Sequence, residues 1–234
     1  MCLKPSDAWL PTLGAVPVCA MIGIGLLVGR AFSPDRPSAG LFGIASGLGN
    51  AGFTMGGFVI FVLYGQTGLG LASIYCLMWT PVLVLLAYPV ARHYAGEDRR
   101  PLGKLMLGSL LNWRAIPLPT AIVAMFLAGY CVPQPAAISR YRVVDVLVFS
   151  VTATAYFSIG LRLHFGEVGA LARQIAALAG MRFVVAAGLG LVLVSLTRLT
   201  AAPLTGMARD VYLIESFVPT AVTMVGLANM FHLR

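Results

Sequence analysis

Charged side chains are scarce in this sequence: only 10% of its 234 residues are Asp, Glu, Lys or Arg. Soluble domains average about 25% charged residues, so this shortage excludes a soluble globular protein. Hydrophobic residues make up 59% of the chain, and the mean hydropathy is +0.89. The composition therefore indicates an all-α integral membrane protein whose apolar runs cross the bilayer as helices.

Cysteine and histidine are also few. The four cysteines (Cys2, Cys19, Cys76 and Cys131) lie too far apart for a disulfide framework or the usual spacing of metal ligands. The sequence has no HExxH motif, no histidine inside an apolar run and no pair of carboxylates there, which disfavours an intramembrane enzyme. His93, His164, His232 and Asp145 fall at the ends of runs, where we expect them at the membrane interface. We expect no cofactor and no metal.

Seven apolar runs are long enough to cross the bilayer. They cover residues 10–32, 40–64, 69–94, 116–132, 143–161, 174–196 and 207–231. A charged linker over 97–104, EDRRPLGK, divides the chain into a first part, 1–96, and a second part, 105–234. Residues 105–113 are expected to form an interfacial lead-in to the fourth span, and Pro81 and Pro89 to kink the third.

The net charge of +8 comes from basic residues between the apolar runs, where they set orientation and meet anionic lipid; nucleic-acid binding is not expected. With seven spans, eleven basic residues fall on one side: Arg30, Arg36, Arg92, Arg99, Arg100, Lys104, Arg114, Arg162, Arg173, Arg182 and Arg234. Five fall on the other: Lys4, Arg140, Arg142, Arg198 and Arg209. The bias predicts a plasma-membrane (bacterial inner-membrane) protein with its N-terminus outside and the 97–104 linker in the cytoplasm.

The second span is rich in glycine around a single amide, Asn50. Each glycine inside a helix costs roughly 1 kcal/mol relative to alanine, so the cluster predicts an interruption at mid-membrane. The alternative is close helix packing through the GxxxG pairs Gly43/Gly47 and Gly52/Gly56. The seventh span, 207–231, is interrupted by Pro219 and runs in the opposite direction. Two interrupted helices of opposite direction are typical of inverted-repeat transporters, whose substrate site lies between them.

The order of several motifs resembles the auxin efflux carrier family of membrane transporters. These motifs are GNAGFTMGG with YGQTGLGLAS (49–57 and 64–73), the lead-in ending at Asn112, Ser158-Ile159-Gly160, and ESFVPTAVTMVGLA (215–228). The resemblance implies two inverted five-helix repeats whose broken fourth and ninth helices cross. It also implies transport of small organic anions, such as auxin or dicarboxylates, as an efflux carrier or permease. On that template the seven spans match helices three to nine of ten.

The sequence also departs from this family. Trp113 follows Asn112 where the family often has proline, and the first crossover relies on glycine alone. Three helices of the template have no counterpart, so the chain is expected to be either an inactive partial transporter or a reduced member of the family. A sodium-coupled anion symporter of the bile-acid type is the other transporter class to weigh, although it requires more oxygen ligands than this chain offers.

The predicted substrate site lies where the two interrupted helices, 40–64 and 207–231, cross. The residues assigned to it are Asn50, Gly49, Thr54, Ser216, Pro219 and Thr220. The Asn50 amide is expected to face a substrate carboxylate or the partner helix, and Pro219 to free carbonyls beside the Ser216 and Thr220 hydroxyls. The alternatives are an ordinary interhelical hydrogen bond and a simple kink. The expected partners are a small organic anion, the lipid bilayer, a coupling proton and a second copy of the chain.

Two charged residues fall inside apolar runs. Glu215 lies about two turns into the seventh span and is the expected carrier of a coupling proton, because intramembrane carboxylates usually face a cavity or a partner. Its alternatives are a structural pair with Arg182 or Arg209, or a shallow interfacial position. Arg182 lies in the sixth span, where it would attract an anion; snorkelling of its side chain to the cytoplasmic face is the simpler interpretation.

Overall fold

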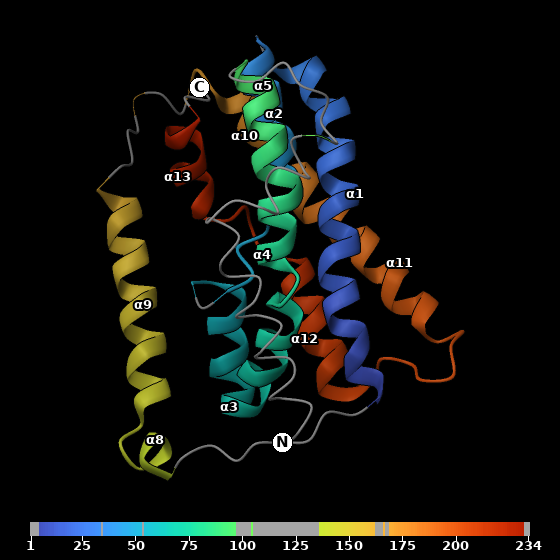
Figure 1. Ribbon diagram of the computed structural model, residues 1–234, viewed down its shortest axis with the longest axis vertical. Helices are drawn as coiled ribbons and strands as arrows, with labels where there is room; N and C mark the ends of the chain where they lie inside the picture. The colour runs from blue at the N-terminus through green and yellow to red at the C-terminus, as the bar shows by residue number, and fades with distance from the viewer. Residues whose placement is uncertain are drawn as a thin grey trace.

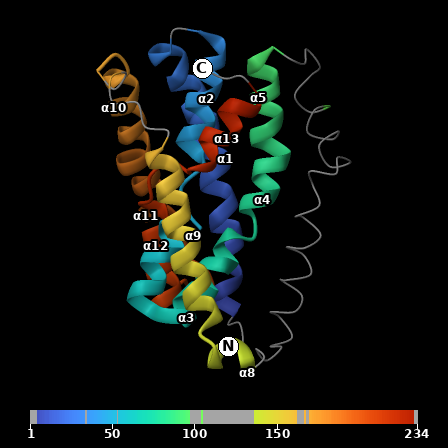
Figure 2. The same cartoon turned by 90° about the vertical axis from the view of Figure 1, so that its left-hand side faces the viewer.

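The computed structural model describes residues 5–33, 35–52, 54–96, 104, 136–161, 166 and 169–231. This part of the chain is all-helical, and its helices form one bundle (Figures 1 and 2). The longer α-helices are α1 (Trp9–Phe32), α2 (Arg36–Gly47), α3 (Gly56–Cys76), α9 (Val143–Gly160), α10 (Ala172–Gly180), α11 (Ala187–Thr197), α12 (Gly206–Ser216) and α13 (Thr223–Met230). The shorter pieces are the 3-10 turn η1 (Pro5–Ala8), α4 (Trp79–Val82), α5 (Tyr88–Ala95), α8 (Ala136–Arg140) and the π-helical turns η2 (Leu83–Ala87) and η5 (Met181–Ala186).

Four helical stretches are long and apolar enough to cross a membrane, which supports a membrane protein. They are Ser6–Phe32, Gly56–Cys76, Val143–Gly160 and Ala172–Thr197. Helix α9 stands at the left edge of the bundle in Figure 1 and in front of it in Figure 2, and only two of its side chains, Val148 and Thr152, are buried. An apolar helix with so little internal burial suits contact with lipid.

The helix α3 turns back on itself at Gly65. This glycine has φ +62° and ψ −153°, a conformation that L side chains disfavour and that breaks the helix. A Cβ on Gly68 would lie 2.9 Å from Ile60 Cγ2, and one on Gly57 would lie 3.7 Å from Leu69 Cδ1. Residues 12 apart in one straight helix would be about 18 Å apart, so residues 56–64 and 66–76 are two arms packed together. The tight turn predicted at 65–68 lies at this point.

Helices α2 and α3 are separated by non-helical backbone, and so are α12 and α13. The described residues between Leu48 and Met55 form no helix, and neither do residues 217–222. Gly49 and Thr220 pair across these two segments in an isolated antiparallel bridge. Helix α2 begins at Arg36, earlier than the predicted boundary at residue 40, because Asp35 caps it by accepting a 2.7 Å hydrogen bond from the Ser38 N–H.

The tightest helix contact joins α1 to α2 through glycines on both helices. A Cβ on Gly25 would lie 2.6 Å from the Ser46 Cβ, and one on Gly47 would lie 2.7 Å from the Val18 carbonyl oxygen. A Cβ on Gly43 would also meet the α1 side chain of Leu26. The first GxxxG pair therefore packs helices together. Gly52, in the second pair, faces open space.

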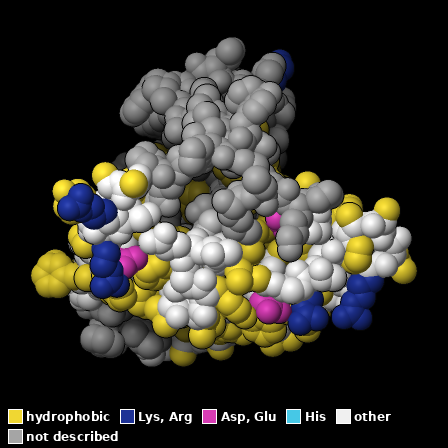
Figure 3. Space-filling model, turned by 90° about the horizontal axis from the view of Figure 1, so that it is seen from below, with side chains coloured by type: hydrophobic (Ala, Val, Ile, Leu, Met, Phe, Trp, Pro, Cys, Tyr) yellow, Lys and Arg dark blue, Asp and Glu magenta, His cyan; other side chains and the backbone are white. Residues whose placement is uncertain are grey.

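Apart from Arg182 and Lys104, the described basic side chains lie at the two ends of the bundle. The α5 end, where α1 and α5 finish and α2 and α10 begin, carries Arg30, Arg36, Arg92 and Arg173. The opposite end, named here the Gly65 end, carries Arg140, Arg142, Arg198 and Arg209. Figure 3 views the Gly65 end, where dark blue basic groups lie beside magenta acidic ones; Arg142 pairs with Asp145 at 2.7 Å and Arg209 with Asp210 at 3.3 Å.

Several predicted features lie outside the described residues. These are the linker 97–104 apart from Lys104, the lead-in 105–113 with Asn112, the fourth span 116–132, and Cys2, Cys131, His164 and His232. In the third span, where kinks at Pro81 and Pro89 were expected, the helix contains the π-helical turn η2 between the two prolines.

Candidate functional site

The two non-helical segments are joined by backbone hydrogen bonds at the centre of the bundle. The Asn50 N–H donates to the Pro219 carbonyl at 2.7 Å, and the Ala221 N–H donates to the Leu48 carbonyl at 2.8 Å. The Thr220 hydroxyl adds a 3.1 Å bond to the Ala45 carbonyl. Backbone groups that leave a helix in lipid must find partners inside the protein, and each segment supplies them to the other.

Arg182 reaches this crossing from η5, the π-helical turn that links α10 to α11. Its guanidinium donates to the Val218 carbonyl from Nε (3.1 Å) and Nη2 (2.7 Å), and from Nη1 to the carbonyls of Ser46 (3.2 Å) and Gly47 (3.4 Å). The last carbonyls of a helix have no intrahelical partners, and a cation is favourable beside them. Arg182 therefore caps α2 at its C-terminus and holds the segment after α12.

The position of Arg182 corrects the simpler sequence interpretation. Snorkelling would bring the guanidinium to the cytoplasmic face, but the residue is only 5% exposed. Arg182 therefore no longer belongs to the eleven basic residues that the sequence assigned to the cytoplasmic side. The three carbonyls freed by the two interruptions are stronger partners for it than distant headgroups, because a buried unpaired carbonyl is costly.

Glu215, near the end of α12, points at the start of α3. It is 1% exposed, and its carboxylate lies so close to Gly56 that any side chain there would collide with it. Neither carboxylate oxygen has a hydrogen-bond partner among the described residues. The N–H groups of Gly56 and Gly57 are already bonded to the carbonyls of Asn50 (3.0 Å) and Gly52 (2.8 Å). The N-terminal end of the α3 dipole still favours negative charge at this point.

The Glu215 side chain is buried within the bundle. Among the described residues, neither of the expected ion pairs forms, because neither Arg182 nor Arg209 makes a salt bridge with it. Arg209 instead bonds to Asp210. Glu215 and Arg182 do line one small cavity, of about 20 Å³, together with Ser216, Tyr75 and Trp79 among others. A space of that size holds about one water molecule.

Asn50 and Thr54 lie on another side of the crossing. The Thr54 hydroxyl donates to the Asn50 side-chain oxygen, and both residues line a cleft of about 410 Å³ that also touches Val151 of α9. The backbone N–H of Asn50, and not its side-chain amide, makes the hydrogen bond to the second segment. Gly49 faces the Arg182 guanidinium so closely that a Cβ would collide with it.

A second cleft, of about 640 Å³, extends from the crossing toward the α5 end. Thr220 lies on its wall at the crossing, and Ser33 and Ser38 lie on its wall at the α5 end. Apolar side chains from α2, α10 and α13 form most of its lining. Ser216 lines neither of the large clefts: its hydroxyl donates to the Tyr212 carbonyl at 2.8 Å and packs against Gly190.

The eight residues assigned from sequence thus lie at or directly beside one crossing, and three further residues were missed. Trp79 lines both the small cavity and the 410 Å³ cleft, Tyr75 lines the small cavity, and Cys76 donates to the Ala51 carbonyl at 3.6 Å. When an aromatic or cysteine residue lies in an apolar run, the sequence does not show how deep its side chain lies in the bundle or which way it points. Only the turn at Gly65, which brings the third span back beside the second, places them here.

The described part of the chain holds no group of three His, Cys, Asp or Glu side chains that would bind a metal. Comparisons with protein-family models, with curated proteins and with solved structures found no match to this chain.

Proposed function

We propose that this protein is a secondary transporter of small organic anions, which works by alternating access around the paired segments 48–55 and 217–222. The observation that carries the proposal is the antiparallel pairing of Gly49 with Thr220 in a bundle of apolar helices. Non-helical backbone is tolerated at membrane depth only where protein covers it or where it lines a cavity. Transporters use such segments as substrate sites.

The directions of the helices support two inverted halves. Helix α2 starts at the α5 end and continues past the interruption into the first arm of α3. Helix α12 starts at the Gly65 end, where the Tyr64 hydroxyl donates to Asp210 at 3.3 Å, and continues past its interruption into α13. We interpret each pair as one broken helix, so that two broken helices of opposite direction cross at Gly49 and Thr220.

The clefts supply a route for a substrate of modest size. Asn50 lines one cleft and Thr220 the other, and their volumes of about 410 and 640 Å³ fall in the range typical of small-molecule sites. The 410 Å³ cleft touches both paired segments, since Ala221 and Val222 line it beside Asn50, and the 640 Å³ cleft touches the second segment at Thr220. Arg182 supplies positive charge where the two segments meet, beside the carbonyls of Gly47 and Val218, and this charge favours an anion over a cation.

The same arginine argues against a sodium-coupled symporter. Sodium binding requires several oxygen ligands, and the freed carbonyls of Ser46, Gly47 and Val218 already accept hydrogen bonds from Arg182. The fixed guanidinium takes the place that a mobile cation would need. Glu215, a buried carboxylate with no hydrogen-bond partner in the described part of the chain, remains as the group that would bind and release a coupling proton.

The test is uptake of labelled indole-acetate and malate into proteoliposomes, with and without a proton gradient and in sodium-free buffer. Glu215→Gln removes the proposed proton site, and Asp145→Asn makes the same chemical change in an ion pair at the Gly65 end. We expect gradient-driven uptake by the wild type and Asp145→Asn, and its loss in Glu215→Gln. A folded wild type that transports neither compound above empty liposomes overturns the proposal and supports an inactive partial chain; uptake that requires sodium supports the symporter.

A further inference from the structure

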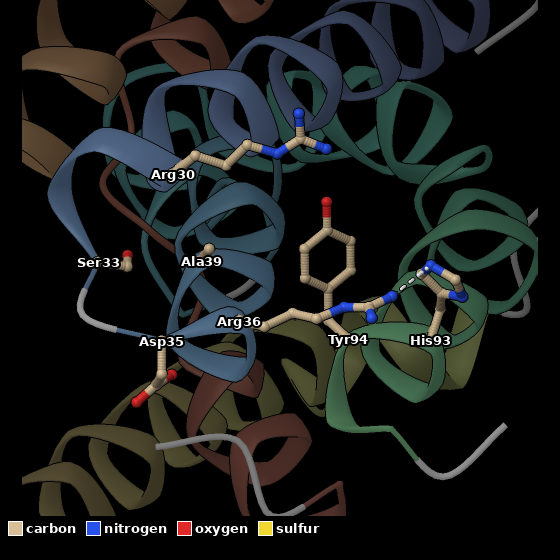
Figure 4. A pocket seen from close by; sticks show the side chains of 7 residues that line it. All are labelled: Arg30, Ser33, Asp35, Arg36, Ala39, His93 and Tyr94. Atoms are coloured by element: carbon tan, nitrogen blue, oxygen red, sulfur yellow. Dashed lines mark hydrogen bonds between the residues drawn. The ribbon is translucent and has the colours of Figure 1, made fainter. Parts of the chain in front are cut away.

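A second polar cavity, far from the crossing, lies at the α5 end. Its volume is about 410 Å³, and the end of α1, the start of α2 and the end of α5 form its walls (Figure 4). Arg30, Arg36, His93 and Tyr94 supply its polar groups. In Figure 4 the Tyr94 hydroxyl points toward Arg30, while the Arg36 side chain extends past the Tyr94 ring to His93. The function proposed above uses none of these residues.

The frame of this cavity is built by close helix contacts. A Cβ on Gly40 would lie 2.6 Å from Tyr94 Cγ, so α2 and α5 pack closely beside the cavity that Ala39 and Tyr94 line. A Cβ on Gly29 would lie 2.9 Å from the Ala39 carbonyl oxygen, which fixes α1 against α2 in the same way. Contacts this close hold the side chains in place before any ligand arrives, and such preorganisation favours binding.

The hydrogen bonding of the cavity leaves donors without acceptors. Arg36 Nη2 lies 2.8 Å from His93 Nε2, and a guanidinium only donates, so Nε2 accepts and the imidazole carries its proton on Nδ1. That Nδ1 atom is buried and has no hydrogen-bond partner among the described residues. Arg30 forms no hydrogen bond or ion pair within the described part of the chain. Arg36 also lies 5.6 Å from the centre of the Tyr94 ring, which orients its plane.

The acidic residue on the wall does not neutralise these groups. Asp35 accepts the Ser38 N–H as the cap of α2, and Figure 4 shows its carboxylate turned away from Arg30 and Arg36. The cavity therefore combines two permanent positive charges with unused donors from Arg30, Arg36 and His93 and with the hydroxyls of Ser33 and Tyr94. This set of donors matches an anion with several acceptor oxygens.

We infer that this cavity binds a phosphate-type oxyanion, held between the Arg30 and Arg36 guanidinium groups with His93 and Tyr94 beside it. Guanidinium forks match phosphate oxygens in pairs, and a tetrahedral anion offers more acceptors to this many donors than a carboxylate does. The cavity opens at the end of the bundle where α1 and α5 finish. Two sources present the same chemistry there: the phosphodiester headgroup of an anionic lipid and free inorganic phosphate.

The experiment compares wild type, Arg30→Gln, the double variant Arg30→Gln/Arg36→Gln and Arg173→Gln. Arg173 is the matched control, because it is an exposed arginine at the same end that stacks on Phe32 outside the cavity. Titration calorimetry in detergent measures inorganic phosphate binding against chloride at equal ionic strength. Native mass spectrometry of protein from nanodiscs of phosphatidylcholine with phosphatidylglycerol measures retained lipid. Thermal unfolding confirms that each variant is folded.

We expect the wild type to bind phosphate, phosphatidylglycerol or both in preference to chloride and phosphatidylcholine. Binding should weaken at least tenfold in the double variant, several-fold in Arg30→Gln and less than twofold in Arg173→Gln. Phosphate binding alone identifies the free ion, lipid retention alone identifies the headgroup, and displacement of one by the other identifies a shared site. Equal loss in Arg173→Gln, no loss in Arg30→Gln, or indifference between phosphate and chloride would show a solvated basic rim and overturn the inference.

Discussion

Replacing Arg182 with methionine should destabilise the protein strongly. The substitution keeps an unbranched side chain of similar length but removes every donor to the carbonyls of Ser46, Gly47 and Val218. Each buried carbonyl left without a partner costs about 1–3 kcal/mol, or about 3–9 kcal/mol for three. Removing a buried guanidinium also relieves its own desolvation cost, which offsets part of this loss. We therefore expect the free energy of unfolding to fall by about 3–5 kcal/mol, the lower part of the range.

For a chain of this size, 1 kcal/mol changes the melting temperature by about 2–4 °C, so the expected drop is about 6–20 °C. The measurement is thermal unfolding of the purified protein in detergent, followed by tryptophan fluorescence. Arg182→Lys should recover part of the loss, since an ammonium keeps the charge but cannot reproduce the planar fork of donors. Arg173→Met, at an exposed position, should change the midpoint by less than about 2 °C. If Arg182→Met melts as the wild type does, the carbonyls of the two segments do not depend on this side chain, and the capping argument fails.

Three further predictions concern single contacts. Gly56→Ala places a Cβ against the Glu215 carboxylate and should lower the free energy of unfolding by about 1–3 kcal/mol through overpacking. Gly52 faces open space, so Gly52→Ala should lower it by less than about 1 kcal/mol, and denaturant titration of both variants compares the two losses. Gly65→Ala forces an L residue to φ +62° at the turn inside α3 and should cost about 1–2 kcal/mol, and a midpoint no lower than that of the wild type would contradict the turn. Trp9→Phe removes a 2.9 Å indole hydrogen bond to the backbone between α11 and α12 and should cost about 0.5–1.5 kcal/mol; retention of full stability would show that water replaces the bond.

The helical class and the main spans could be predicted from sequence because both depend on composition and run length. The first, fifth and sixth runs lie close to α1, α9 and the continuous stretch from α10 to α11. Residues 48–55 could be singled out because glycine weakens a helix whatever surrounds it, and residues 217–222 because Pro219 lacks an N–H group. Local chemistry decides these features.

The partners of the charged side chains could not be predicted in the same way. Arg182 lies near the start of its run, where snorkelling is the ordinary expectation, but the carbonyls that attract it belong to segments about 36 and 135 residues away along the chain. Glu215 contacts Gly56, again a contact that only the folded chain creates. The polar cavity of Arg30, Arg36 and His93 was likewise seen in the sequence only as separate interfacial residues.

The turn at Gly65 decides whether α3 counts as one membrane crossing or as two arms that return to the same end of the bundle. Counted by length and hydropathy, the 21 residues of α3 would carry the chain across the bilayer once and place everything after them on the far side. The positive φ at Gly65 instead turns the chain back toward the α5 end, so that His93 and Tyr94 line one cavity with Arg30 and Arg36. A topology that counted α3 as one crossing would therefore invert the second half of the protein, whereas the turn predicted at 65–68 keeps the two arms apart.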